Sequence, residues 1–287
     1  MLNKFAGLAV LALATSAHAA IISNDFSTVT PGIFANATAF GADAVLGVNV
    51  RNPVTVAATG GVGNSAAITD GSDVFVRSTV THSTIATTTF SSYFRFDPRG
   101  SLIGGFFGMG WSTAGGVTSG QSPYSNANQN DRFLVGLSRG NSNVMSLATS
   151  GSMESQTLIP TPGGGEIFAA TATVNNWYQM SFSLLFNRNT VTPADSTWTV
   201  SDLLVRDWGT DGVTGGGTVL NLTSRTIDPT TYAANLNNQS AAHAVVIENY
   251  DRGARALDNI QIIPEPSSFA LGAAALLVLG FRRRRNG

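Results

Sequence analysis

The chain has 287 residues, a formal net charge of −1 and no cysteine, which excludes disulfides, thiolate catalysis and cysteine-based metal sites. Between residues 20 and 263 there are no lysines, 11 arginines, 13 aspartates and 3 glutamates, a net excess of five negative charges. Such a segment argues against a nucleic-acid partner, because that partner requires a patch of cations that neutralises phosphates.

The first 19 residues have the pattern of a secretory signal peptide. A polar start with Lys4 is followed by an apolar run, Phe5–Ala14, and then by small residues that include Ala17 and Ala19. A cation, an apolar stretch and an A-x-A exit define this class of segment. We expect export and cleavage by signal peptidase after Ala19. A buried N-terminal helix of the body is the alternative.

The body, residues 20–262, is predicted to be all-β. Gly, Ser, Thr and Asn are abundant, whereas the usual helix formers Leu, Glu and Lys are sparse. Short apolar or alternating segments between turn residues predict strands at 44–50, 54–58, 73–80, 89–96, 102–111, 132–138, 144–148, 177–186, 197–207, 242–249 and 256–262. Long loops are expected at 115–130 and 209–217. This series, with no convincing helix, predicts one antiparallel sandwich or barrel.

Three segments of the body carry a resemblance to a known fold family. Asn176–Phe182 has the sequence Asn-Trp-Tyr-Gln-Met-Ser-Phe. Asn24–Ser27 lies near the start of the body, and Leu257–Ile262 lies at its end. Together they resemble concanavalin-A-like jelly rolls, including laminin-G-like domains. The resemblance implies a single antiparallel β-sandwich whose first and last strands lie together. Immunoglobulin-like sandwiches and carbohydrate-binding-module jelly rolls are the alternatives.

Two patterns suggest catalysis, and neither is complete. Gly136–Gly140 matches the G-x-S-x-G elbow with Ser138 as nucleophile, which requires a helix after the serine and a later histidine such as His243. A strand-like run follows instead, so a hairpin turn is the better interpretation. Glycoside hydrolysis requires two carboxylates roughly 5–9 Å apart. The body glutamates, Glu154, Glu166 and Glu248, have no acid two residues away. We expect a non-enzymatic protein.

Metal binding is weakly supported by the sequence. The body histidines, His82 and His243, lie far apart along the chain without cysteine partners, which does not support zinc. Calcium accepts oxygen ligands from loops, and Asp25 with Asp258 is the best candidate pair if the terminal strands lie together. No other cofactor is expected.

Carbohydrate recognition would use exposed aromatic side chains that stack on sugar rings. Trp111 and Trp198 lie within apolar strands, where core packing is the expected role of a large ring. Tyr124 and Trp208 lie in predicted loops. They are therefore the candidate ligand-binding residues.

Residues 263–287 carry a second targeting pattern. Pro264-Glu265-Pro266 is followed by two serines, by the apolar run Phe269–Phe281 and by Arg282-Arg283-Arg284-Arg285. As a helix of roughly 1.5 Å per residue, the 13 apolar residues reach about 20 Å, less than a hydrocarbon core of about 30 Å. This short transmembrane helix spans only if the bilayer thins and the arginines snorkel. The arginines act as a membrane stop and place the body outside the cytoplasm.

The order of these three elements resembles the PEP-CTERM sorting domain, over residues 263–285. The resemblance implies recognition of Pro264, Glu265 and Pro266 by exosortase, usually with removal of the tail. It also implies a Gram-negative-type envelope, often with exopolysaccharide or biofilm production. A plain tail anchor is the alternative.

We therefore expect an exported protein of the cell envelope, cell surface or extracellular matrix, held by the membrane before processing, with extracellular polysaccharide as its expected ligand. The alternatives are a polysaccharide-acting enzyme on a jelly roll and a purely structural or adhesive matrix protein.

Overall fold

The computed structural model describes residues 21–34, 44–45, 54–57, 61–62, 65–69, 74–78, 81–82, 84–96, 105–114, 131–139, 144–152, 155–159, 169–173, 175–228, 233–238, 242–250 and 253–265. The predicted signal peptide, the expected loop at 115–130 and the tail beyond Glu265 lie outside these residues. Within them, no helix has both the length and the apolar character needed to cross a bilayer.

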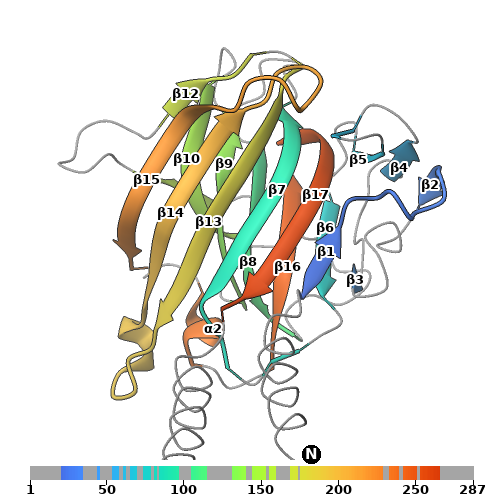
Figure 1. Ribbon diagram of the computed structural model, residues 1–287. Helices are drawn as coiled ribbons and strands as arrows, with labels where there is room; N and C mark the ends of the chain where they lie inside the picture. The colour runs from blue at the N-terminus through green and yellow to red at the C-terminus, as the bar shows by residue number, and fades with distance from the viewer. Residues whose placement is uncertain are drawn as a thin grey trace, which may run out of the picture.

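The strands form two antiparallel sheets that face each other (Figure 1). Sheet A has the order β15-β14-β13-β7-β17-β5-β4-β2, with β1 also paired to β17. Its strands are β1 (Ile22–Asn24), β2 (Gly32–Phe34), β4 (Val54–Ala57), β5 (Ala66–Ile68), β7 (Thr88–Phe96), β13 (Trp177–Asn187), β14 (Thr197–Asp207), β15 (Gly217–Ile227) and β17 (Ala254–Pro264).

Sheet B has the order β11-β10-β9-β8-β16-β6-β3, with β12 also paired to β10. Its strands are β3 (Ala44–Val45), β6 (Val74–Ser78), β8 (Phe106–Thr113), β9 (Arg132–Arg139), β10 (Val144–Ser152), β11 (Ser155–Leu158), β12 (Ala169–Thr171) and β16 (His243–Tyr250). The chain crosses between the sheets several times, and β16 and β17 return to lie beside β8 and β7. The predicted all-β antiparallel sandwich is confirmed.

Side chains that alternate along each strand fill the space between the sheets. Trp111 and Trp198 are fully buried there, as the sequence predicts. The Trp198 ring stacks on Phe133 with centroids 4.5 Å apart, and its Nε1–H donates to the Asn237 side chain at 3.1 Å. A buried tryptophan removes a large apolar area from water, which makes both rings core residues. The Trp198 donor is satisfied, whereas Nε1 of Trp111 has no hydrogen-bond partner among the described residues.

Several elements lie outside the predicted strand ranges: the short strands β1, β2, β5, β11 and β12, the long strand β15 and the helix α2. Strand β15 was not predicted, because it lies at the edge of sheet A and buries only Leu220 and Leu222, which leaves no clear alternation to read. The expected loop at 209–217 therefore ends one residue earlier. A helix, α2 (Ala234–Asn238), is present although none was expected. Five residues are too short to show a helical period.

The first and last strands lie together, as the jelly-roll resemblance implies. Ile22 is paired with Ile262, and the Ile21 N–H donates to the Ile262 carbonyl at 2.8 Å. Strand β17 then continues to Pro264, opposite Thr88. Strand β17 and the Pro-Glu-Pro motif therefore overlap by one residue, Pro264.

Candidate functional site

Sheet B has a charged face directed away from sheet A, which we call the outward face of sheet B. Because side chains alternate along a strand, Val76, Phe133 and Ile247 point into the core, while Arg77, Arg132 and Glu248 point outward. The outward face also carries a small apolar cluster separate from the main core, formed by Phe75, Phe106, Leu134, Ala148 and Val246. Charge and apolar surface are thus buried together on one face.

Arg132 and Glu248 form an ion pair on this face. Arg132 Nη1 donates to Glu248 Oε1, and both side chains are 0% exposed. The two residues come from β9 and β16, so the arginine reaches across β8. Its guanidinium also lies over Phe75, with Cζ 5.2 Å from the ring centroid. The arrangement requires strands that are far apart in the sequence.

Glycines form the surface beneath the ion pair. Glu248 lies opposite Gly108, Gly108 lies opposite Gly136, and Gly110 lies opposite Val246. A Cβ added at Gly110 or Gly136 would overlap the backbone of the neighbouring strand. These positions therefore require glycine.

Several polar atoms of this face have no hydrogen-bond partner among the described residues. They are Nε and Nη2 of Arg132, Nε and Nη1 of Arg77, and Oε2 of Glu248. Buried polar groups are nearly always satisfied, so such a concentration points to a ligand, an ion or water as the missing partner. Burial lowers the pKa of Arg132 to about 10, against the opposing effect of Asp131. Burial also lowers the pKa of Arg77.

The chemistry of this face favours binding an anion. At neutral pH two guanidiniums and one carboxylate leave a net charge of +1, whereas the body as a whole is acidic. A guanidinium presents its donors in a plane that matches a carboxylate. Among the described residues of this face Glu248 is the one carboxylate, so a hydrolase that uses two carboxylates is not assembled from them.

Trp208, predicted to bind ligand, lies on the outer side of sheet A in the connection between β14 and β15. Its Nε1–H donates to Gln179 Oε1 at 3.2 Å, and its ring centroid is 6.2 Å from that of Tyr93. It packs against a small cluster that includes Trp177. With its donor satisfied and its ring partly covered, Trp208 has the contacts of a packing residue. Tyr124 lies outside the described residues.

The carboxylates predicted to bind calcium lie close to the β1–β17 pairing but accept hydrogen bonds from other groups. Asp25 is exposed and accepts from the backbone and hydroxyl of Ser27, at 3.0 and 2.6 Å, which lowers its pKa. Asp258 is fully buried and accepts from the N–H groups of Val62 and Asn259, each at 2.7 Å.

Burial raises the pKa of Asp258 to about 7; the two backbone donors oppose the shift, and the Asp25 charge adds to it. No group of three or more His, Cys, Asp or Glu that could hold a metal occurs in the described part of the chain. The calcium site stays a prediction.

The structure separates Ser138 from His243. Ser138 lies opposite Phe106, whereas His243 lies opposite Thr113, seven positions or about 23 Å along β8. After β9 the chain continues as strand β10, not as the helix that a nucleophile elbow requires. His243 instead pairs with His82, but no third ligand joins them among the described residues.

The sorting motif begins at the end of the sandwich. The N–H of Glu265 donates to the Thr87 carbonyl at 2.7 Å, and its exposed carboxylate accepts from Ser183 Oγ at 3.4 Å. The other predicted targeting residues lie outside the described residues: Ala17, Ala19, Pro266, Arg282, Arg283, Arg284 and Arg285.

Sequence reasoning missed Arg77 and Arg132. Each is a charged residue in a strand that is otherwise mostly apolar, Val-Phe-Val-Arg-Ser and Arg-Phe-Leu-Val-Gly-Leu. A cation in a strand does not by itself mark a site, because Arg95 and Arg206 also lie in strands. Both residues could have been noticed, but which charges meet depends on strand order.

These features define the class of the protein: a two-sheet antiparallel β-sandwich with paired terminal strands and buried charge on one outward face. No protein-family model matches the chain, and no curated protein matches it. The PL-14 alginate lyase from Aplysia kurodai is a similar solved structure, with 13% identity, 74% of this chain and 87% of that chain covered, and a TM-score of 0.42.

Two further similar structures have comparable scores. A variant of the alginate lyase Aly36B in complex with an alginate trisaccharide has 10% identity, covers 84% of this chain and 96% of that one, and has a TM-score of 0.41. The carbohydrate recognition domain of Emp46p has 8% identity, coverage of 85% and 97%, and a TM-score of 0.39. Likenesses of this degree assign no function to this chain.

Proposed function

We propose that this chain is an exported, surface-held protein that binds an acidic polysaccharide at the outward face of sheet B and does not cleave it. The observation that carries the proposal is the set of unpartnered guanidinium donors of Arg77 and Arg132 on that face. Planar carboxylates of uronic acids are the sugar groups that such donors fit best.

Arg77 is the point where a ligand first makes contact. It is half-buried, whereas Arg132 is fully buried beside Glu248. Arg77 lies opposite Val246 and two residues from Phe75, next to the ion pair. A carboxylate bound to Arg77 would therefore approach the second guanidinium, and the attraction would be strongest where water is excluded.

The address of the protein is the second part of the proposal. The N-terminal pattern directs export, and Pro264, Glu265 and Pro266 with the apolar run and Arg282–Arg285 direct membrane insertion and recognition by exosortase. The folded body reaches as far as Glu265, which supports a division of labour between a sandwich that binds and a tail that locates it. The site of action is then the cell surface or extracellular matrix.

One observation favours a second candidate function, a polysaccharide-acting enzyme. Glu248 keeps one unpartnered, buried oxygen beside two guanidiniums, and an enzyme that acts on an acidic polymer needs both charge neutralisation and a proton-transfer group. A third candidate, a structural matrix protein, binds no sugar.

Titration calorimetry tests the three candidates. Purified protein is titrated with oligouronates and with neutral glucans of equal length, and the mixtures are then analysed for shortened or unsaturated products. Binding of oligouronates alone, weakened by salt and without new products, supports the proposal. Product formation assigns an enzyme. Equal binding of both sugars, or of neither, contradicts the proposed site.

A further inference from the structure

We propose that, while the tail is in the membrane, one end of the sandwich faces the bilayer surface. This is the end that carries Glu265 and the β13–β14 hairpin. The hairpin between β14 and β15 is then held farthest from the lipid. The partner of this end is the headgroup surface of the membrane. The inference rests on the anchoring part of the proposed function.

The tether between sandwich and membrane is short. Glu265 is fixed to the sheet by its hydrogen bond to Thr87, and only Pro266, Ser267 and Ser268 precede the apolar run that begins at Phe269. Four residue steps of at most about 3.5 Å span about 14 Å, whatever their conformation. The end of β17 therefore stays within that distance of the apolar run.

The register of sheet A shows which hairpin lies at this end. Pro264 is opposite Thr88, and Thr88 is opposite Leu184. Strand β13 then ends at Asn187 and turns through residues 188–196, which include Val191, 88% exposed. The β13–β14 hairpin thus projects beyond the row that contains Pro264.

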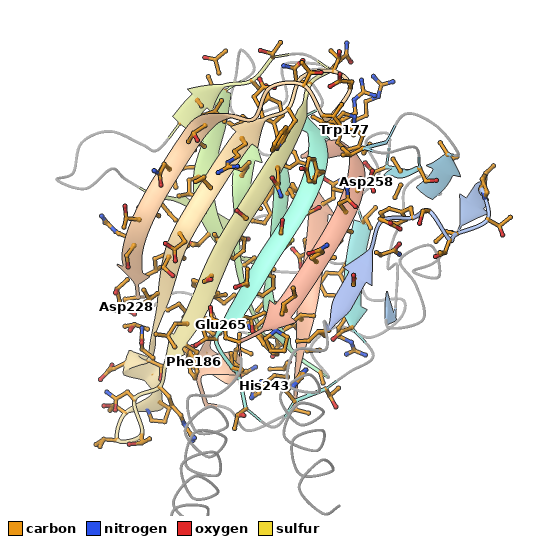
Figure 2. All side chains as sticks on the ribbon, viewed as in Figure 1. Trp177, Phe186, Asp228, His243, Asp258 and Glu265 are labelled. Atoms are coloured by element: carbon orange, nitrogen blue, oxygen red, sulfur yellow. The ribbon has the colours of Figure 1, made fainter. Side chains whose placement is uncertain are left out.

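The other hairpin lies at the opposite end. Tyr178 is opposite both Phe94 and Asp207, and residues 208–216 follow Asp207, with Val213 63% exposed. Strand β14 has 11 residues, so the two hairpins are separated by about 36 Å. Figure 2 shows Trp177 and Asp258 toward one end of the sandwich, and Phe186 and Glu265 toward the other.

The first described residues of the body lie at the same end as Glu265. Ile21 donates to the Ile262 carbonyl, three residues before Glu265. Among the described residues, Asp195, Asp228 and Glu265 place negative charges at this end, against the positive charge of Arg188 (Figure 2). This balance gives no attraction to anionic lipid, so the orientation follows from the short tether and should not depend on salt.

The absence of cysteine makes the test direct. Val191→Cys and Val213→Cys are made separately in the full chain without its signal peptide, labelled with one fluorophore and reconstituted into neutral vesicles that contain spin-labelled headgroup lipids. Both side chains are exposed, so both variants should fold. We expect quenching at position 191 and none at position 213, unchanged by salt.

The outcomes separate this inference from the anchoring itself. Quenching at 213 but not at 191, or equal quenching at both positions while the chain stays on vesicles, overturns the orientation but leaves anchoring intact. Failure of the full chain to associate with vesicles overturns both. A chain that ends at Glu265 is the control, and it should remain in solution with neither position quenched.

Discussion

Arg132 and Glu248 are paired across strand β8 with both side chains fully buried, on the face of sheet B directed away from the core. A buried ion pair costs desolvation and is weak evidence of a stabilising role. Its place beside Arg77, which has further unpartnered donors on the same face, fits a role in binding.

Replacing one residue of this ion pair should destabilise the protein more than replacing both residues. Glu248→Gln leaves the Arg132 guanidinium buried without a counter-charge and should lower the free energy of unfolding by about 3–5 kcal/mol. The double variant Arg132→Met with Glu248→Leu removes both charges and should recover most of this loss. Urea unfolding measures both, with the exposed Arg188→Gln as a control. A double variant as unstable as the single one would contradict this account.

Arg77 should determine affinity without determining stability. Arg77→Gln removes charge-assisted hydrogen bonds worth about 1.5–3 kcal/mol and should weaken oligouronate binding roughly tenfold or more. Arg77→Lys keeps the charge but loses the planar donors, so it should give an intermediate affinity. Arg188→Gln, on the exposed β13–β14 hairpin, should bind like the unmodified protein. If both Arg77 variants bind oligouronates in calorimetry as tightly as the unmodified protein, the outward face of sheet B is excluded as the site.

Trp208 should behave as a packing residue. Trp208→Ala removes its contacts with Tyr93 and Gln179 and should lower the free energy of unfolding by on the order of 2 kcal/mol, less than a fully buried tryptophan would. Oligouronate affinity should stay unchanged. Loss of affinity with unchanged stability would instead confirm the ligand-binding role predicted from the sequence.

The strands of the core could be predicted because their apolar residues alternate or run together. Strands β13 and β14 match their predicted limits to within a residue. The edge strand β15 could not be predicted in this way, since its side chains are mostly solvated. The pairing of the terminal strands came from the resemblance, not from any periodicity.

The charged site could not be assembled from the sequence. Arg77, Arg132 and Glu248 come from β6, β9 and β16, which are separated by dozens of residues. They share a face only because β16 enters sheet B between β8 and β6. Strand order of this kind is set by long-range packing, which local patterns do not encode.

Asp258 should make stability depend on pH. Its pKa is about 7 in the folded protein, raised by burial from 3.8, so between pH 4 and 7 the folded state binds more protons than the unfolded state. The free energy of unfolding should therefore fall as pH rises through this window, by on the order of 4 kcal/mol at most, and then level off. Chemical unfolding at several pH values measures it. Asp258→Asn should flatten the profile, whereas the exposed Asp228→Asn should not.

The effect of calcium on stability tests whether Asp258 is a metal ligand. If Asp25 and Asp258 hold the ion, millimolar calcium should raise the melting temperature at pH 8, where Asp258 is ionised, and much less at pH 5. Asp25→Asn should abolish the rise. A melting temperature that is equal in calcium and in chelator at pH 8 would leave Asp258 with its backbone partners alone.

The targeting patterns at the two ends of the sequence predict the mass of the mature protein. Intact-mass spectrometry of the protein from its own cells, with surface and medium combined, should show a species that begins at Ala20 and ends between Pro264 and Pro266, free or with an attached group. An end in this range keeps strand β17 whole, because that strand ends at Pro264. A species that ends at Gly287 would show a tail that anchors without being processed, and recognition by exosortase would then be wrong.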